Sequence, residues 1–186
     1  PRSTPSIRRQ RQMCIRDSNY IIGKDSRFLI NSGVASMGYG LPAAIGACIA
    51  YNRKTTICLE GDGSIMMSLQ ELQTILTNRL PIKIFLINNQ GYHSIRQTQN
   101  NLFGEREKVG IGPESGDLSF PDFGKIAAAF GYPYRSAHTN ADMMRAVSET
   151  LIQEGCAICE IFVSTEQKFE PCLLYTSDAA DELDGV

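Results

Sequence analysis

Strand-like and helix-like segments alternate along residues 40–163, and this alternation constrains the fold more than any other feature of the sequence. Short apolar runs such as TTICL and IKIFLI are separated by longer segments whose apolar residues recur at helical spacing. We expect helices over residues 40–52, 69–78, 92–102, 121–130 and 141–153, and strands over residues 55–59, 82–87, 132–137 and 157–163. This alternation predicts an α/β fold, namely a doubly wound, mostly parallel sheet with helices on both faces.

Two segments carry finer local predictions. Ser68 and Glu71 form an S-x-x-E pair, which predicts a capping box at the start of the helix over residues 69–78. Residues 104–119 are Gly-rich, polar and irregular, and a segment of this length without periodicity indicates a functional loop.

The two ends of the chain differ in composition from the rest. Residues 1–18 contain five arginines and one aspartate, whereas residues 171–186 contain four acidic residues and no basic one. Both ends lack periodicity, and MCIRDS and CLLYTSDAADE resemble translated adapter or vector sequence. We therefore expect non-native or disordered tails over 1–18 and 171–186, flanking one domain over residues 19–170.

Charge and hydropathy exclude several classes of protein. The net charge of −2 disfavours a nucleic-acid binder that depends on phosphate contacts. No run approaches the ~18 apolar residues that a membrane helix needs. Cys156 and Cys159 fall on a predicted strand, where residues three apart point to opposite faces, so they are a poor zinc site. The remaining cysteines are expected to be buried free thiols in a reducing compartment.

Two of the strongest strands end in polar motifs. TTICLE runs into Gly61-Asp62-Gly63-Ser64, and IKIFLI runs into Asn88-Asn89-Gln90-Gly91-Tyr92. The carboxyl ends of parallel strands face one crevice, which is where ligands bind in such sheets. Carboxylate, amide and main-chain oxygens together suit a hard cation such as Mg²⁺ or Ca²⁺, and Mg²⁺ takes its remaining ligands from phosphate and water.

Each motif also has a simpler interpretation. GDG can be a plain tight turn, and NNQG a loop in which Asn tolerates left-handed geometry. The occurrence of both motifs, each after an apolar strand and with a helix between them, favours a functional site. The backbone amides of Gly63 and Ser64 are then suited to hold a phosphate bridged to the protein by the cation.

GDGS at residues 61–64, followed by Asn88-Asn89 after the next strand, resembles the signature of thiamine-diphosphate-dependent enzymes. NSGVASMGYGLPAAIGA at residues 31–47 is similar to the matching stretch of the acetolactate synthase and pyruvate oxidase group. The resemblance covers about residues 31–163 and implies the diphosphate-binding domain of an enzyme that uses thiamine diphosphate and Mg²⁺. It implies decarboxylation of a 2-keto acid, followed by transfer or ligation of the resulting acyl or aldehyde unit.

The resemblance also implies roles for individual residues. Met37 matches the apolar wedge that bends the cofactor, and the carbonyl of Ala35 would accept a hydrogen bond from the pyrimidine amino group. Gly63 and Ser64 would touch the diphosphate. The implied Mg²⁺ ligands are Asp62, the Asn89 side chain and the Gly91 carbonyl. The full predicted cofactor-binding set is Ala35, Met37, Gly61, Asp62, Gly63, Ser64, Asn89, Gly91 and Tyr92.

The family pattern leaves the catalytic residues unassigned. The glutamate that protonates the pyrimidine ring belongs to a separate pyrimidine-binding domain, which the resemblance implies comes from a neighbouring subunit of a homodimer or tetramer. No Glu of this chain matches it, so we expect the fragment alone to be inactive. Biosynthetic acetolactate synthases have a Trp near Gln97–Gln99, and simple pyruvate decarboxylases have an acid at the position of Ile95. The keto acid is therefore unidentified.

The sequence indicates no firm functional role for three other charged or titratable residues. His93 has no assigned role because a site position and a helix-surface position are equally compatible with the sequence. Arg96 could meet a substrate carboxylate, but a solvated helix charge is favoured. His138 lies far from both motifs in the sequence and is expected to be structural.

Two alternative functions remain open. Gly38, Gly40 and Ala43 match G-x-G-x-x-A at the start of a helix, and Glu60 lies at the spacing of an acid that binds a ribose hydroxyl. This pattern would indicate a nicotinamide-dinucleotide-binding dehydrogenase domain, although it leaves Asp62, Asn88 and Asn89 without a role. A non-catalytic phosphate-binding domain would keep the same fold and need no metal.

Overall fold

The computed structural model describes residues 27–31, 35–104 and 108–166. The chain divides into two compact units, residues 1–35 with 166–186 and residues 36–165. All the helices and strands described belong to the second unit. The predicted tails over 1–18 and 171–186 lie outside the described residues, so the predicted domain boundaries remain predictions.

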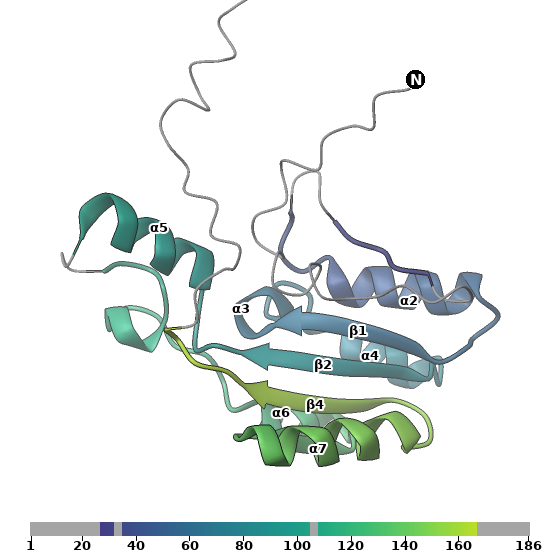
Figure 1. Cartoon of the computed structure of the whole chain (residues 1–186). Helices are drawn as coiled ribbons and strands as arrows, with labels where there is room; N and C mark the ends of the chain where they lie inside the picture. The colour runs from purple at the N-terminus through teal and green to yellow at the C-terminus, as the bar shows by residue number, and fades with distance from the viewer. Residues whose placement is uncertain (1–26, 32–34, 105–107, 167–186) are drawn as a thin grey trace, which may run out of the picture. The chain divides into compact units, whose positions relative to one another are not determined.

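The centre of the second unit is a parallel sheet of four strands (Figure 1). The strands are β1 (Thr56–Gly61), β2 (Ile82–Asn88), β3 (Tyr134–Ala137) and β4 (Ala157–Phe162). Their order is β1-β2-β4-β3, and all three neighbouring pairs are parallel. Gly61 is paired with Ile87, and Asn88 with Phe162, so the last residues of three strands lie at one edge of the sheet.

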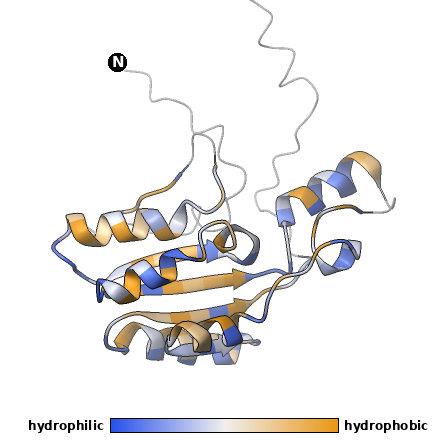
Figure 2. Cartoon of the chain, turned by 180° about the vertical axis from the view of Figure 1, so that it is seen from behind, coloured by the Kyte–Doolittle hydropathy of each residue, from blue (hydrophilic) through white to orange (hydrophobic). Residues whose placement is uncertain are grey.

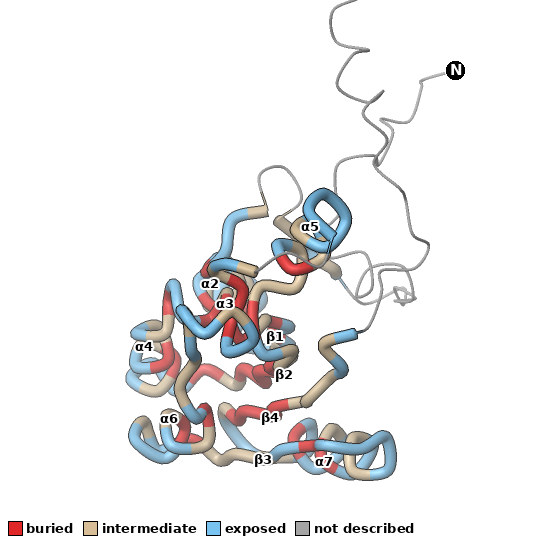
Figure 3. Tube along the Cα trace, turned by 90° about the vertical axis from the view of Figure 1, so that its left-hand side faces the viewer, coloured by how far each residue is buried: buried red, intermediate tan, exposed pale blue. Residues whose placement is uncertain are grey.

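Helices cover both faces of this sheet. They are α2 (Gly40–Ala50), α3 (Asp62–Ile65), α4 (Glu71–Thr77), α5 (His93–Phe103), α6 (Phe123–Phe130) and α7 (Asn140–Ile152), with a 3₁₀ turn, η1 (Pro113–Ser115). Buried side chains of α2, α4 and α6 form one core with the strands, whereas α7 packs on the other face. Figure 3 shows α4 and α6 on one side of the sheet and α7 on the other.

The burial of the central strand explains why its sequence is almost entirely apolar. Ile82, Ile84 and Leu86 are fully buried beneath the first set of helices, and Phe85 belongs to the core under α7. Figure 2 shows the strands as largely hydrophobic segments between more polar helices. A strand covered on both faces has no polar side to present, so it does not alternate as a half-exposed strand would.

The predicted α/β fold class is confirmed, and the observed elements follow the expected order. The differences are local. Residues 62–65 form the short helix α3 directly after β1, outside the ranges predicted to be helical. The predicted capping box is wrong, because α4 begins at Glu71 and the Ser68 hydroxyl is buried with no hydrogen-bond partner among the described residues. Within the described residues, no helix is long and apolar enough to cross a membrane.

The buried core predicts that substitution of two isoleucines changes the free energy of unfolding by different amounts. Ile84→Ala should lower the free energy of unfolding by about 2–5 kcal/mol, because it leaves a cavity beneath the sheet. Ile152→Ala at the end of α7, where the side chain is 84% exposed, should change it by less than about 0.5 kcal/mol. Urea unfolding followed by circular dichroism measures both values, and equal losses would contradict this assignment of the core.

Candidate functional site

The two polar motifs lie together at the carboxyl edge of the sheet. Asp62 follows β1 and begins α3, and Asn89 follows β2 and precedes α5. Because β1 and β2 are neighbouring parallel strands, the chain leaves both at the same edge. Figure 1 shows α3 and α5 beyond the arrowheads of these strands. The adjacency expected from the sequence is therefore confirmed.

Asp62 is a buried carboxylate at the point where the two motifs meet. Its side chain is 1% exposed. One carboxylate oxygen accepts a hydrogen bond from the Gly63 amide at 3.0 Å, and the other accepts one from the Gly91 amide at 2.9 Å. Burial raises the pKa of Asp62 to about 6, although these amides and the charge of Arg96 act in the opposite direction. Burial thus weakens the preference of this carboxyl for its ionised form, and a cation beside it would strengthen that preference.

Two further polar groups, the Asn89 amide and the Gly91 carbonyl, lie next to this carboxylate. The inward-facing end of the Asn89 amide lies 3.2 Å from Asp62 Oδ1 and 2.6 Å from the Gly91 carbonyl oxygen. With its nitrogen inward, the amide donates a hydrogen bond to each oxygen. With its oxygen inward, the amide completes a set of three oxygens, one carboxylate, one amide and one main-chain carbonyl. This donor chemistry is that of a hard divalent cation.

The turn that carries Asn89 and Gly91 is held in an uncommon conformation. Gln90 has φ 56° and Gly91 has φ 140°, and the latter is a backbone geometry that favours glycine. A Cβ atom at Gly91 would also overlap the carbonyl oxygen of Ile111. Gly91 is thus required both for its own conformation and for the close approach of residues 111–112.

Asn88 stabilises the same turn from the side of the sheet. Its amide oxygen accepts a hydrogen bond from the Gln90 amide at 2.9 Å, and its amide nitrogen donates to Glu160 at 2.6 Å. The Tyr134 hydroxyl donates to the other oxygen of Glu160, which is 3% exposed. The last residue of β2 therefore orients the turn instead of facing the site.

Other predicted site residues surround α3. The Gly38 amide donates a hydrogen bond to the Ser64 hydroxyl at 3.0 Å, which joins the segment before α2 to α3. Met37, next to Gly38, is 45% exposed. The Tyr92 ring packs so closely over Gly63 that a Cβ atom there would overlap it. Each of these contacts joins one predicted site segment to another.

Comparison with known proteins identifies the family to which this chain belongs. Residues 12–161 match the family model described as thiamine pyrophosphate enzyme, C-terminal TPP binding domain. The chain belongs to this thiamine pyrophosphate enzyme family. The family uses thiamine diphosphate with Mg²⁺, so the predicted cofactors are confirmed at the level of the family.

Relatives within this family include the large subunits of acetolactate synthases. Identity is 36% over 148 residues with the large subunit of Pyropia yezoensis, which covers 80% of this chain and 24% of that protein. It is 39% over 129 residues with the isozyme 2 large subunit of Escherichia coli strain K12, which covers 69% and 22% of the two chains. The chain therefore spans about a quarter of the length of the relatives that it matches.

The predicted cofactor-binding residues belong to different parts of the structure. Gly61, Asp62, Gly63, Ser64, Asn89, Gly91 and Tyr92 gather at the carboxyl edge of β1 and β2. Gly61 ends β1 with open space beside it, where a Cβ atom would meet nothing within 4 Å. Ala35 belongs to the other compact unit, and its φ of 49° is left-handed.

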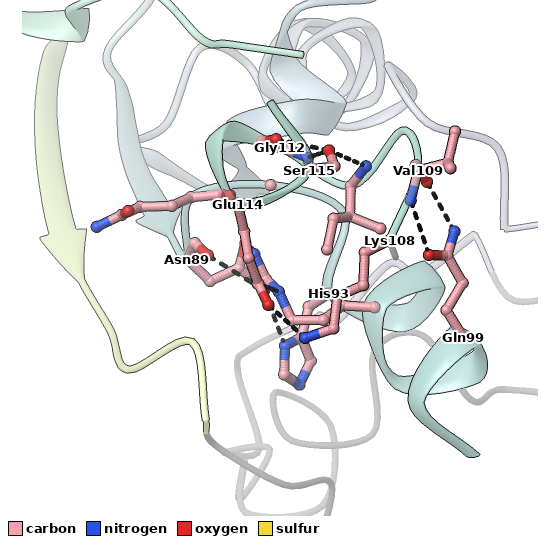
Figure 4. A network of polar contacts seen from close by, with 12 residues as sticks. Asn89, His93, Gln99, Lys108, Val109, Gly112, Glu114 and Ser115 are labelled. Carbon is pink, nitrogen blue, oxygen red and sulfur yellow. Dashed lines mark hydrogen bonds and ion pairs between the residues drawn. The ribbon is translucent and has the colours of Figure 1, made fainter. Parts of the chain in front are cut away.

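The favoured interpretation of Arg96 as a solvated helix charge is wrong. Arg96 is 3% exposed, its Nε donates to Glu114 at 2.8 Å, and it also donates to the carbonyls of Asn89 and Gln90. Its donors are therefore directed at the protein, which also disfavours a contact with a substrate carboxylate. Figure 4 shows Glu114 beside Asn89 and His93.

The two histidines differ in their surroundings. His93 Nδ1 lies 3.5 Å from an Arg96 guanidinium nitrogen, so His93 belongs to the edge of the site. His138 stacks on Phe162 with ring centroids 4.2 Å apart, which agrees with the structural role expected for it.

The structure does not favour the dinucleotide-binding alternative. Residues 27–31 before the glycine pattern do not form a strand. Glu60 is 6% exposed, and its carboxylate lies against Gly40, where a Cβ atom would overlap it. The acid that should bind a ribose hydroxyl is therefore packed beneath the start of α2.

The raised pKa of Asp62 predicts a specific dependence of stability on pH. The folded protein keeps this proton up to about pH 6, whereas the unfolded chain releases it near pH 3.8. Without divalent cations, this stabilising contribution of about 3 kcal/mol is present below pH 4 and is lost as the pH rises through 6. Asp62→Asn should remove that part of the pH dependence.

Urea unfolding in EDTA at pH 4 to 7.5 tests the prediction. The difference between wild type and Asp62→Asn isolates this group from the other titrating residues. Glu154→Gln, at an exposed position, should keep the wild-type profile. Parallel profiles for wild type and Asp62→Asn would contradict a raised pKa at Asp62.

Proposed function

We propose that this chain is the diphosphate- and metal-binding part of an acetolactate synthase-like enzyme that depends on thiamine diphosphate and Mg²⁺. The reaction is decarboxylation of a 2-keto acid, with transfer or ligation of the remaining acyl or aldehyde unit. The observation that carries the proposal is the convergence of Asp62, the Asn89 amide and the Gly91 carbonyl at one edge of the sheet. Identity of 34–39% with acetolactate synthase large subunits supports the reaction class.

In this proposal the three oxygens hold the cation. Asp62 supplies the only formal negative charge of the set, and the cation in turn offsets the cost of keeping that carboxylate buried and ionised. Gly63 and Ser64, which follow Asp62 in α3, are proposed to touch the diphosphate, while the Gly63 amide donates a hydrogen bond to Asp62. When bound, thiamine diphosphate takes up the electrons released as the keto acid loses carbon dioxide.

The residues around the metal ligands keep the site in shape. Met37, exposed beside Gly38, is positioned by the hydrogen bond from Gly38 to Ser64 and is proposed to support the bent cofactor. Ala35 is proposed to accept a hydrogen bond from the pyrimidine amino group through its carbonyl. Tyr92 covers Gly63 and limits the access of water to the diphosphate.

The proposed partners are the rest of the enzyme and its substrate. A pyrimidine-binding domain, normally from a neighbouring subunit, would supply the activating glutamate in a homodimer or tetramer. Four free cysteines among the described residues, three of them buried, support a reducing compartment such as the cytoplasm. Ile95 and Gln97–Gln99 differ from the residues of pyruvate decarboxylases and biosynthetic acetolactate synthases. The proposed substrate is therefore a 2-keto acid of unassigned side chain.

Calorimetric titration tests the binding part of the proposal. Thiamine diphosphate should bind the 186-residue chain with Mg²⁺ and not in EDTA, because the cation bridges the diphosphate to Asp62. Asp62→Ala should weaken this binding at least about 100-fold, since a buried charged ligand is lost. Glu154→Ala is the control and should bind as wild type does. Binding of NADH without a metal would instead support the dinucleotide alternative.

A second measurement tests whether catalysis requires a domain other than this chain. The purified 186-residue chain with thiamine diphosphate and Mg²⁺ should release no carbon dioxide from pyruvate above the rate of the free cofactor, because the family resemblance assigns the activating glutamate to a separate domain. Carbon dioxide release can be followed by a coupled assay. Turnover by this chain alone would contradict the proposal that the activating glutamate lies on a different domain.

A further inference from the structure

A segment outside both sequence motifs packs directly on the turn that carries Asn89 and Gly91. The Tyr92 amide donates a hydrogen bond to the Ile111 carbonyl at 2.8 Å. Gly112 lies so close to the Gln90 carbonyl that a Cβ atom on it would overlap that oxygen. Ile111 is fully buried. Residues 108–117 are named here the clamp segment, and the Asn89–Gly91 turn is named the ligand turn. The clamp segment thus contacts the ligand turn through its backbone on both sides of Gly91.

Arg96 joins the same turn to the clamp segment through its side chain. It donates to the Gln90 carbonyl at 3.1 Å and to the Asn89 carbonyl at 3.4 Å. Its Nε also donates to Glu114 Oε2 at 2.8 Å, where the two form an ion pair. The arginine side chain is 3% exposed and the glutamate side chain 39%, so the ion pair joins a buried guanidinium to a partly exposed carboxylate. One guanidinium therefore ties two consecutive carbonyls of the ligand turn to one carboxylate of the clamp segment.

Glu114 is held in place by further contacts within the clamp segment. Its second oxygen pairs with Lys108. The hydrogen bonds from Lys108 and Arg96 lower the pKa of Glu114. Gln99 of α5 exchanges two hydrogen bonds with the backbone of Val109, at 2.7 and 3.1 Å. Figure 4 shows these contacts, with Glu114 beside Lys108 and Gln99 beside Val109. The clamp segment is thus attached to α5 at two places, Arg96 and Gln99, and Arg96 also contacts the ligand turn.

We propose that Arg96 and Glu114 are positioning residues that hold the Asn89–Gly91 turn in its metal-binding conformation. This inference rests on the proposed function, because it concerns the same three oxygens. The two residues need not touch the cation. They fix the carbonyls of residues 89 and 90, and so set the directions of the Asn89 side chain and of the Gly91 carbonyl. A turn with two residues at positive φ needs such external support.

Removal of the Glu114 charge should loosen this turn without unfolding the sheet. Glu114→Gln leaves Arg96 buried with an uncharged partner, which weakens a charge-assisted hydrogen bond. The chain offers a matched control in the ion pair between Arg135 and Glu149, which also joins Nε to Oε2, at 2.9 Å. That pair links β3 to α7, so Glu149→Gln should leave the ligand turn unchanged.

Two readouts on the 186-residue chain test the proposal. Amide hydrogen exchange by NMR, without metal, should be at least about 10-fold faster at Gly91 and Tyr92 in Glu114→Gln than in wild type, and unchanged at Ile84. Titration with Mn²⁺ in the presence of thiamine diphosphate, followed by electron paramagnetic resonance, should give a dissociation constant raised about 10-fold. Glu114→Asp, which keeps the charge, should recover part of both effects, and Glu149→Gln should show neither.

The outcomes separate this inference from the proposed function. Unchanged exchange at Gly91 and Tyr92 in Glu114→Gln would overturn it. Equally accelerated exchange at Ile84 would also overturn it, because Glu114 would then act on the stability of the whole domain. If exchange is faster only at the turn but the wild-type chain binds no Mn²⁺, the positioning of the turn stands and the proposed metal site is wrong.

Discussion

The buried carboxylate of Asp62 is the constraint on which the rest of the site depends. It lies where two neighbouring strands end, it is 1% exposed, and it accepts hydrogen bonds from amides on both strand ends. These hydrogen bonds couple the GDGS motif to the turn after β2. Burial nevertheless raises the pKa of this carboxyl to about 6, so the amides only partly compensate the cost of the charge. In the proposed site, a divalent cation beside this carboxylate would supply the missing compensation, so metal binding would also stabilise this edge of the sheet.

The parallel sheet places this carboxylate, and the turns position its partners. Pairing of β1 with β2 brings Gly61 level with Ile87, so Asp62 and Asn89 follow the two strands at the same edge of the sheet. Asn88 then bridges Glu160 and the Gln90 amide, which turns the next residues back toward Asp62. The glycine at position 91 permits both the positive φ and the approach of Ile111. The geometry of the three oxygens thus follows from the sheet register, one bridging amide and one glycine.

Much of the fold and the centre of the site could be predicted from the sequence. Apolar runs of the right length revealed the buried strands, and their polar endings revealed the site, because parallel strands carry their functional residues at one edge. Local patterns were less reliable. Ser68 has the spacing of a capping residue, yet its hydroxyl has no hydrogen-bond partner in the described part of the chain, and α4 begins only at Glu71. The short helix α3 has too few residues to show a period.

The periodic patterns of the sequence could not predict the residues that hold the ligand turn. Arg96 lies on a polar helix, and its partner Glu114 lies in an irregular segment eighteen residues later, so nothing in the local period indicates that the arginine is buried. Gly110 and Gly112 in that segment were the available signal, since glycines permit the close backbone contact seen between Gly112 and Gln90. Long-range ion pairs of this kind depend on the tertiary structure.

A crystal structure of the chain with Mn²⁺ and thiamine diphosphate, with an anomalous difference map at the manganese edge, tests the central claim most directly. We predict one strong peak within about 2.0–2.4 Å of Asp62, the Asn89 amide oxygen and the Gly91 carbonyl oxygen, with diphosphate oxygens completing the coordination. A manganese peak bound by other residues, with the Asn89 amide nitrogen still directed at Asp62, would contradict it.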